Sequence, residues 1–241
     1  IPKKRKILKE SIQINKINKN NLKNLNVKIP IGGLTVISGV SGSGKSSLVK
    51  HTLKGALENY LNHNITNTKQ YSDVKITNKA IKDYEFIDQN PIGKSSRSNP
   101  STYLKIYDDI RKLYSNQKLS KIRNYKTGYF SFNIDGGRCN KCKGEGENTI
   151  EMQFMADVQI ICDECKGKRF KKEILEIKFF DKNISDILDL SIDEAITFFK
   201  EHNEIKIAKK IQPLQDVGLG YVKLGQSSST FSGGEAQRIK L

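Results

Sequence analysis

The chain lacks any run of about 18 consecutive apolar residues, the length that a membrane-spanning helix needs. It also lacks a secretory signal, in which a charged segment precedes a short apolar stretch and a cleavage site. The first absence argues against a membrane protein. The second argues against the oxidising compartments in which disulfides form. We therefore expect a cytoplasmic protein without a membrane partner.

Acidic residues are few compared with basic ones. The chain carries 26 Asp and Glu against 42 Lys and Arg, so its formal net charge is +16 over 241 residues. Such a charge favours anionic partners, either nucleotides or nucleic acids. A composition rich in Lys, Asn and Ile explains the same excess, and the charge alone does not decide between these explanations. The length suits about one or two domains.

Residues 39–46 match the P-loop pattern G-x-x-x-x-G-K-[ST] at every position. Residues 34–37 before them predict a buried strand, and a helix is expected to begin after Lys45. Backbone N–H groups of such a turn, together with the positive end of the helix, can wrap phosphate oxygens. Lys45 can reach the outer phosphates and the Ser46 hydroxyl can bind Mg²⁺. The predicted nucleotide contacts are Gly39, Ser41, Gly42, Ser43, Gly44, Lys45, Ser46 and Ser47.

The four cysteines form two C-x₂-C pairs separated by 19 residues, which is a typical zinc spacing. Each pair is followed by Lys-Gly, and the glycine permits the tight turn of a zinc knuckle. No further ligand suggests an open coordination position, so the predicted metal is structural. Two disulfides, a redox pair or an iron–sulfur cluster are the alternatives, and the missing secretory signal argues against disulfides. The predicted zinc ligands are Cys139, Cys142, Cys162 and Cys165.

Basic residues crowd the four cysteines. Four thiolates on Zn²⁺ leave a net charge of about −2, so part of this basicity balances the metal site. The remainder could meet the phosphate backbone of a nucleic acid. The basic residues are Arg138, Lys141, Lys143, Lys166, Lys168, Arg169, Lys171 and Lys172.

A second nucleotide motif lies near the end of the chain. Ser-Gly-Gly-Glu at residues 232–235, followed by a helical pattern, is typical of the signature of ABC-type ATPases, which completes the site of an opposing nucleotide-binding domain. Gln89, after a short expected strand at residues 84–87, fits the position of the Q-loop that senses Mg²⁺ and the attacking water. The predicted signature contacts are Ser232, Gly233, Gly234, Glu235 and Gln237.

These motifs resemble those of the UvrA family, the damage-sensing ATPases of the UvrABC excision nuclease in bacterial nucleotide excision repair. The order P-loop, Q-loop, four-cysteine module and signature resembles the second, C-terminal nucleotide-binding half of that family. The matching stretches span nearly the whole chain: SGVSGSGKSSL, DQNPIGKSSRSNPSTY, FSFNIDGGRCNKC, IEMQFMADV, CDECKGKRF, ISDILDLSIDEA, DVGLGYVKLGQ and FSGGEAQRIKL.

The resemblance implies an α/β fold, in which an ABC-type P-loop ATPase core, here incomplete, carries an inserted α+β signature domain with a four-cysteine zinc module. It implies residues 1–90 as the ATP-binding core and residues 91–225 as the signature domain, with the zinc module at 137–170. Residues 226–241 would hold the signature motif and the start of its helix. ATP, Mg²⁺ and Zn²⁺ are the implied cofactors. Damaged double-stranded DNA, a UvrB-type helicase subunit and a second copy in a homodimer are the implied partners.

The sequence departs from the family pattern in several places. Phe231 stands where the family has Leu, and Lys94 stands where an Arg is usual. Lysine cannot make the bidentate contact of an arginine. No aromatic residue precedes Tyr60, so the sequence shows no stacking residue for adenine upstream of the P-loop.

No Walker B motif, four apolar residues followed by Asp-Glu, comes after the signature. Asp193 and Glu194 do not qualify, because Ser191 interrupts the apolar run and a helix capping box explains both acids. We therefore expect this chain alone not to hydrolyse ATP efficiently. It begins with Ile1 and ends at Leu241 within an expected helix, so we also expect it to be part of a longer polypeptide.

Two other functions remain open. A UvrA-like paralogue used in drug resistance or self-protection would share every motif described above. A non-catalytic zinc module that binds DNA, with a vestigial P-loop, would share the cysteines and the basic residues. Secondary-structure patterns predict strands at residues 129–134 and 174–180, a helix from Pro100 to Leu113 and a capped helix after Ser191.

Overall fold

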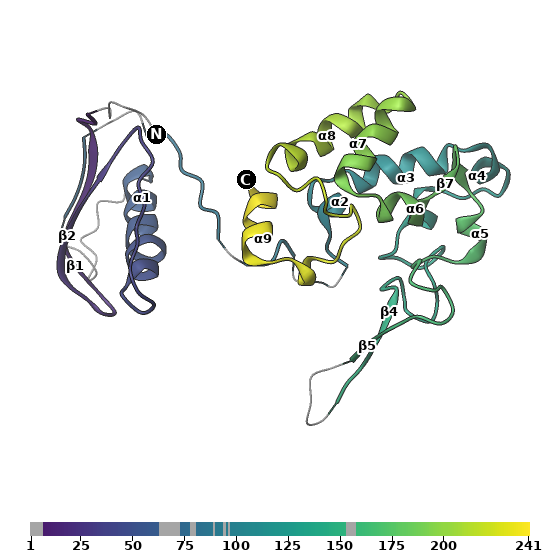
Figure 1. Cartoon of the computed structure of the whole chain (residues 1–241), viewed down its shortest axis with the longest axis horizontal. Helices are drawn as coiled ribbons and strands as arrows, with labels where there is room; N and C mark the ends of the chain where they lie inside the picture. The colour runs from purple at the N-terminus through teal and green to yellow at the C-terminus, as the bar shows by residue number, and fades with distance from the viewer. Residues whose placement is uncertain are drawn as a thin grey trace. The chain divides into compact units, whose positions relative to one another are not determined.

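The computed structural model describes residues 7–62, 73–77, 81–88, 90–93, 95, 97–152 and 158–241. The chain divides into two compact units, Ile1–Phe86 and Ile87–Leu241. Figure 1 shows strands and a helix in the first unit and mostly helices in the second. The division of roles among residues 1–90, 91–225 and 226–241 stays a prediction.

The first unit contains an antiparallel sheet with the strand order β2-β1-β3. Its strands are β1 (Ser11–Lys19), β2 (Leu22–Pro30) and β3 (Asp73–Ile76). The β1–β2 register shifts between Ile14 and Ile17, and Lys16 has a positive φ of 52°. An extra residue in one strand changes the face on which the following side chains lie, which lets Ile17 join Ile14 in the core.

A helix follows the P-loop and packs on the same core (Figure 1). It begins as a π-helical segment, η1 (Ser47–Leu53), and continues as α1 (Lys54–Leu61). The helix predicted after Lys45 is therefore confirmed. Buried side chains of Leu48 and Ala56 contribute its apolar face to the sheet.

The strands predicted at residues 34–37 and 84–87 are wrong, because both segments are irregular. Leu34 is 95% exposed and Val36 is 76% exposed. A buried parallel strand needs neighbouring strands that accept its backbone hydrogen bonds and cover its faces. Among the residues that the structure describes, no strand pairs with either segment. The apolar pattern is present at residues 34–37, but no strand among the described residues covers it.

The second unit is a helical body with two short hairpins (Figure 1). Its core includes the fully buried rings of Tyr114, Phe130, Phe132 and Phe199. Its helices are α2 (Pro100–Tyr103), α3 (Tyr107–Ser115), α4 (Lys118–Ile122), α5 (Lys172–Leu175), α6 (Ile184–Asp189), α7 (Ile192–Glu201), α8 (Ile205–Asp216) and α9 (Gly233–Lys240). Two 3-10 turns, η2 (Thr127–Phe130) and η3 (Ser228–Thr230), join them. The hairpins are β4 (Glu147–Ile150) with β5 (Val158–Ile161), and β6 (Lys178–Phe179) with β7 (Lys182–Asn183).

Several predicted elements of this unit need correction. The helix predicted from Pro100 to Leu113 is two helices, because Lys105 between them has a positive φ of 55°. Residues 129–134 form the end of η2 and an irregular segment rather than a strand. Phe130, Ser131 and Phe132 are all buried, so the burial does not alternate as it would in a strand with one exposed face. Residues 174–180 hold the end of α5 and the short β6.

The capping box predicted at Ser191 is confirmed. The Ser191 hydroxyl accepts a hydrogen bond from the Glu194 backbone N–H at 3.3 Å, and the Glu194 carboxylate accepts one from the Ser191 backbone N–H at 2.8 Å. Within the described part of the chain, no helix is long and apolar enough to cross a lipid bilayer.

Candidate nucleotide and metal sites

The P-loop is built on glycines with backbone conformations that other residues rarely adopt. The φ angles of Gly39, Gly42 and Gly44 are +150°, +79° and +97°. A Cβ atom on Gly44 would lie 2.7 Å from the Cδ2 atom of Leu22. The φ angle of Gly44 therefore favours glycine, and the side chain of Leu22 from the β1–β2 hairpin packs close beside it.

Lys45 lies across the loop that precedes it. Its ammonium Nζ donates hydrogen bonds to the carbonyl oxygens of Gly39, at 2.8 Å, and Val40, at 2.7 Å. Ser46 begins the helix without a capping hydrogen bond from its side chain. The positive charge of Lys45 and the Ser46 hydroxyl thus belong to the same short turn as the loop glycines.

Two asparagines of the β1–β2 turn brace this loop, and the sequence analysis missed them. The Asn21 amide donates to the Gly42 carbonyl oxygen at 2.6 Å. The Asn20 amide donates to the hydroxyl of the buried Ser47 at 2.9 Å. Asn-Asn in a sequence indicates only a turn. Nothing in the residue pattern showed that this turn would pack on the P-loop.

The signature serine caps a helix. The Ser232 backbone N–H and hydroxyl donate to the Glu235 Oε2 atom at 2.8 and 2.9 Å, and the Glu235 backbone N–H donates to the Ser232 hydroxyl oxygen at 3.3 Å. The Tyr221 hydroxyl donates to the other oxygen of Glu235 at 2.6 Å. The hydrogen bonds from Tyr221 and Ser232 lower the pKa of the Glu235 carboxyl. Its carboxylate is therefore committed to fixing the start of α9.

The first residues of the signature are open to solvent. Ser232, Gly233 and Gly234 are exposed, and a Cβ atom on Gly234 would meet nothing within 4 Å. The start of α9 thus lies on the surface of the second unit. Gln237 is half-buried. Gln89 and Lys94 lie outside the residues that the structure describes. The predicted nucleotide contacts of the P-loop, the Q-loop and the signature stay predictions.

The four cysteines come together in one buried cluster, in which all four Sγ atoms lie within 4.8 Å of one another. Tetrahedral zinc with Zn–S bonds of about 2.3 Å places its sulfur atoms about 3.8 Å apart. The Cys139–Cys162 and Cys142–Cys165 Sγ separations are 3.9 and 3.6 Å. All four cysteines are free rather than paired in disulfides. The donor set, its burial and its spacing fit one structural zinc ion.

Two matching turns hold the thiols. Lys143 and Gly144 have positive φ angles of 50° and 87°, and Lys166 and Gly167 have 53° and 83°. Gly144 has no room for a side chain, because a Cβ atom would lie 2.1 Å from the Phe132 carbonyl oxygen. The two halves therefore fold as similar knuckles, as their Cys-x-x-Cys-Lys-Gly sequences predict.

Burial disfavours ionised thiols in this cluster. It raises the pKa of the Cys165 thiol to about 12 and also raises the pKa of Cys139. Burial acts in the same direction on Cys162, but hydrogen bonds from the backbone of Cys165 and Glu164 and from the side chains of Cys165 and Cys139 together lower that pKa to about 7. A full set of thiolates in this interior requires a metal ion to stabilise it.

A polar hollow of about 470 Å³ separates the cysteine module from the loop that leads to the signature. Arg97 Nε lies 2.7 Å from Glu145 Oε1 on one wall. Arg169 donates from Nη2 to the Gly225 carbonyl oxygen at 3.3 Å on another. Arg97 and Arg169 therefore link the metal module to its neighbouring loops.

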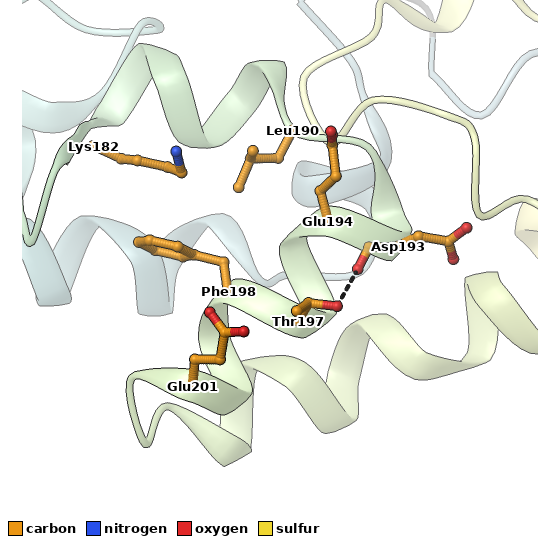
Figure 2. A pocket seen from close by; sticks show the side chains of 7 residues that line it. All are labelled: Lys182, Leu190, Asp193, Glu194, Thr197, Phe198 and Glu201. Atoms are coloured by element: carbon orange, nitrogen blue, oxygen red, sulfur yellow. Dashed lines mark hydrogen bonds between the residues drawn. The ribbon is translucent and has the colours of Figure 1, made fainter.

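Asp193 and Glu194, the acids that resemble part of a Walker B motif, line an open groove of about 430 Å³ (Figure 2). Glu194 belongs to the Ser191 capping box, which lowers its pKa through hydrogen bonds from Ser191. Asp193 accepts a hydrogen bond from the Gln215 amide at 2.7 Å. Figure 2 shows Thr197 donating to the Asp193 backbone carbonyl, at 3.1 Å. The Glu194 carboxylate thus caps the start of α7, and the Asp193 carboxylate joins α7 to α8.

Comparisons with known proteins agree with the motifs. UvrABC system protein A of Clostridium acetobutylicum is 50% identical over 242 residues, covering 100% of this chain and 26% of that protein. The Lactococcus lactis protein of the same name is 48% identical over 244 residues, covering 100% of this chain and 26% of that protein. The crystal structure of UvrA2 from Deinococcus radiodurans matches with a TM-score of 0.87 and 40% identity, over 99% of this chain and 28% of that one.

No family model matches the chain. The structural match supports the ABC ATPase type of α/β fold that the sequence predicts. The chain spans about a quarter of the length of these relatives. Over that quarter, the resemblance to the UvrA family that the motifs predict is confirmed.

Proposed function

We propose that this chain is the second nucleotide-binding half of an ATP-dependent subunit that recognises DNA damage in nucleotide excision repair. The observation that carries the proposal is the match of the whole chain, at 50% identity, to UvrABC system protein A. The structure of UvrA2 matches the chain as well, at 40% identity and a TM-score of 0.87.

ATP would bind at the P-loop of the first unit. The Lys45 ammonium would exchange the carbonyl oxygens of Gly39 and Val40 for phosphate oxygens, which are stronger acceptors. Backbone N–H groups of residues 39–46 would surround the phosphates, at the positive end of the helix that follows. The Ser46 hydroxyl would bind Mg²⁺, which neutralises phosphate charge when it is present.

The cysteine module would handle DNA. Cys139, Cys142, Cys162 and Cys165 would hold zinc as a structural cross-link. Lysines and arginines around them would contact the phosphate backbone, and a protein that accepts many lesions is expected to sense duplex deformability rather than base edges. Through the hydrogen bond from Arg169 to Gly225, a movement of this module would shift the loop before the signature.

The partners follow from the same resemblance. The exposed start of α9, at Ser232, is accessible to the P-loop of an opposing nucleotide-binding domain, as a homodimer requires. In this proposal the dimer loads a UvrB-type helicase subunit onto the damaged strand. The chain would contribute its P-loop and signature to hydrolysis but would not hydrolyse ATP efficiently alone.

Nucleotide affinity tests the first part. Lys45→Ala should weaken ATP binding at least about tenfold, because it removes the charge that meets the phosphates. Lys50→Ala is the matched control, because Lys50 is an exposed lysine on the following helical segment. It should change the dissociation constant by less than about twofold. Equal affinities for all three proteins would support the vestigial P-loop instead.

Metal removal tests the second part. A chelator should lower the preference for damaged over undamaged duplex DNA more than it lowers ATP affinity, because the metal and the P-loop belong to different units. Both quantities should be measured on the same preparation, with bound zinc determined by elemental analysis. An equal loss of both would contradict this division of labour.

A further inference from the structure

An ion pair joins two segments that lie 152 residues apart in the sequence. Lys240 is the last residue of α9, the helix that begins at the signature, and its ammonium contacts the Asp88 carboxylate. The same ammonium lies 3.4 Å from the Asp88 backbone carbonyl oxygen. The side chains of Lys240 and Asp88 are only 17% and 27% exposed. This pair is therefore better shielded from water than surface pairs such as Lys223 with Asp189, at 59% and 69%.

Asp88 is also fixed by its own turn. Its Oδ1 atom accepts a hydrogen bond from the Asn90 backbone N–H at 3.2 Å, and its Oδ2 atom accepts one from the Asn90 side-chain amide. Asp88 directly precedes Gln89, the predicted Q-loop residue. The carboxylate thus joins Asp88, the residue before Gln89 in the sequence, to Lys240 of α9.

The signature helix makes hydrogen bonds at its start and along its side. At its start, Ser232 and Glu235 form a capping box. Near its end, Arg238 Nη1 donates to the carbonyl oxygens of Val217 and Gly218 at 3.2 and 3.1 Å. Lys240 and Ser232 therefore belong to one helix, α9, whose start and side both have hydrogen-bond partners in the second unit.

We propose that Lys240 and Asp88 are positioning residues that hold the Q-loop segment and the signature helix in a fixed relation, so that a nucleotide engaging one motif is sensed at the other. This inference rests on the proposed nucleotide-binding function. A charge-assisted hydrogen bond shielded from water is strong enough to couple two segments. Loss of the ion pair should uncouple the two segments without preventing nucleotide binding at the P-loop, because Lys45 belongs to the other unit.

A purely structural ion pair is the competing explanation, and the chain offers a matched control for it. Lys210 Nζ lies 2.5 Å from Asp109 Oδ2 and joins α8 to α3. Its side chains are 39% and 19% exposed. Neither residue belongs to any nucleotide motif. Breaking this control pair should cost stability alone.

The experiment uses the full-length protein with Lys240→Met, Asp88→Asn, the double variant, Lys240→Arg and the control Lys210→Met. ATP affinity, the kcat and KM of hydrolysis and the melting temperature are measured for each. Lys240→Met should lower kcat about tenfold, while ATP affinity stays within about twofold of the parent. The double variant should be no slower than Lys240→Met, since both changes break one interaction. Lys240→Arg should retain most of the rate.

Three results would overturn the inference alone: a parental kcat in Lys240→Met, full additivity in the double variant, or an equal loss of kcat in Lys210→Met. If Lys240→Met does not fold, Asp88→Asn and Lys240→Arg decide by the same criteria. A parent protein that binds no ATP would overturn the proposed function and this inference together. Normal ATP binding in the parent protein, together with a parental kcat in Lys240→Met, would overturn this inference and leave the proposed function standing.

Discussion

The two units differ in how completely they bury their apolar side chains. The second unit encloses large rings such as Phe199 and Phe132 entirely, within a core that draws on most of its helices. The first unit has a small core around Ile14 and Ile17, while Leu34 is almost fully exposed beside the P-loop. The second unit therefore buries these large apolar side chains within its own core. The segment that leads into the P-loop still needs a covering surface.

The sharpest test of this contrast is metal removal. Chelation should unfold the cysteine module, because zinc binding to such sites contributes on the order of 10 kcal/mol at neutral pH. The chain has no tryptophan, so Tyr129→Trp and Tyr60→Trp provide separate fluorescent reporters for the second and first units. Only the Tyr129→Trp protein should change on chelation. A matching change in the Tyr60→Trp protein would break the contrast.

A core truncation should give the next largest effect. Phe199→Ala leaves a cavity at a fully buried site, and we expect it to lower the free energy of unfolding by about 4 kcal/mol. Leu34→Ala removes an exposed side chain and should change it by less than about 0.5 kcal/mol. Urea denaturation followed by circular dichroism measures both. A large loss for Leu34→Ala would mean that its segment is covered in solution.

Within the first unit, alanine substitutions of two glycines distinguish backbone strain in the P-loop from helix propensity in α1. Gly44→Ala forces a side chain onto a φ of +97° and against Leu22, which should cost about 2 kcal/mol. Gly55→Ala lies in α1 with open space around its Cβ position, so it should stabilise by roughly 0.5 to 1 kcal/mol. Thermal unfolding of the two variants should shift in opposite directions. Shifts of the same sign would contradict the tight P-loop turn.

The smallest effect is the pH dependence of the α7 capping box. Hydrogen bonds from Ser191 lower the pKa of Glu194 below its ordinary value of 4.5. A carboxyl whose pKa is lower in the folded state stabilises the fold above the unfolded pKa, and this stability is lost as the pH falls through the folded pKa. Glu194→Gln should therefore flatten the fall of melting temperature below about pH 4.5, with little change near neutrality. An unchanged acid profile would show that Glu194 is not a titrating group of this cap.

Motifs that depend on nearby residues could be predicted, whereas contacts between distant segments could not. The positions of Cys139 and Cys162 follow from spacing, because two knuckles bring four thiols together whatever surrounds them. The Ser191 cap follows from a three-residue pattern. The prediction of a strand at residues 34–37 is wrong, because burial of that segment depends on neighbouring strands rather than on its own side chains. The contact of Asn21 with the P-loop and the ion pair of Lys240 with Asp88 could not be predicted without the tertiary fold. No periodicity in the sequence relates the residues of either contact.

The β4–β5 ribbon depends on the metal module for its register. Glu147 pairs with Ile161, and the adjoining residues Gly146 and Cys162 are joined by a backbone hydrogen bond of 2.9 Å. Its described side chains are largely exposed on both faces, and an isolated two-stranded ribbon is barely stable in water. The zinc ligands thus hold β4 and β5 together at the base of the ribbon. Loss of the metal would leave the backbone hydrogen-bonding groups of both strands unpaired and exposed. Removal of metal should therefore make the protein prone to self-association before its helical body unfolds.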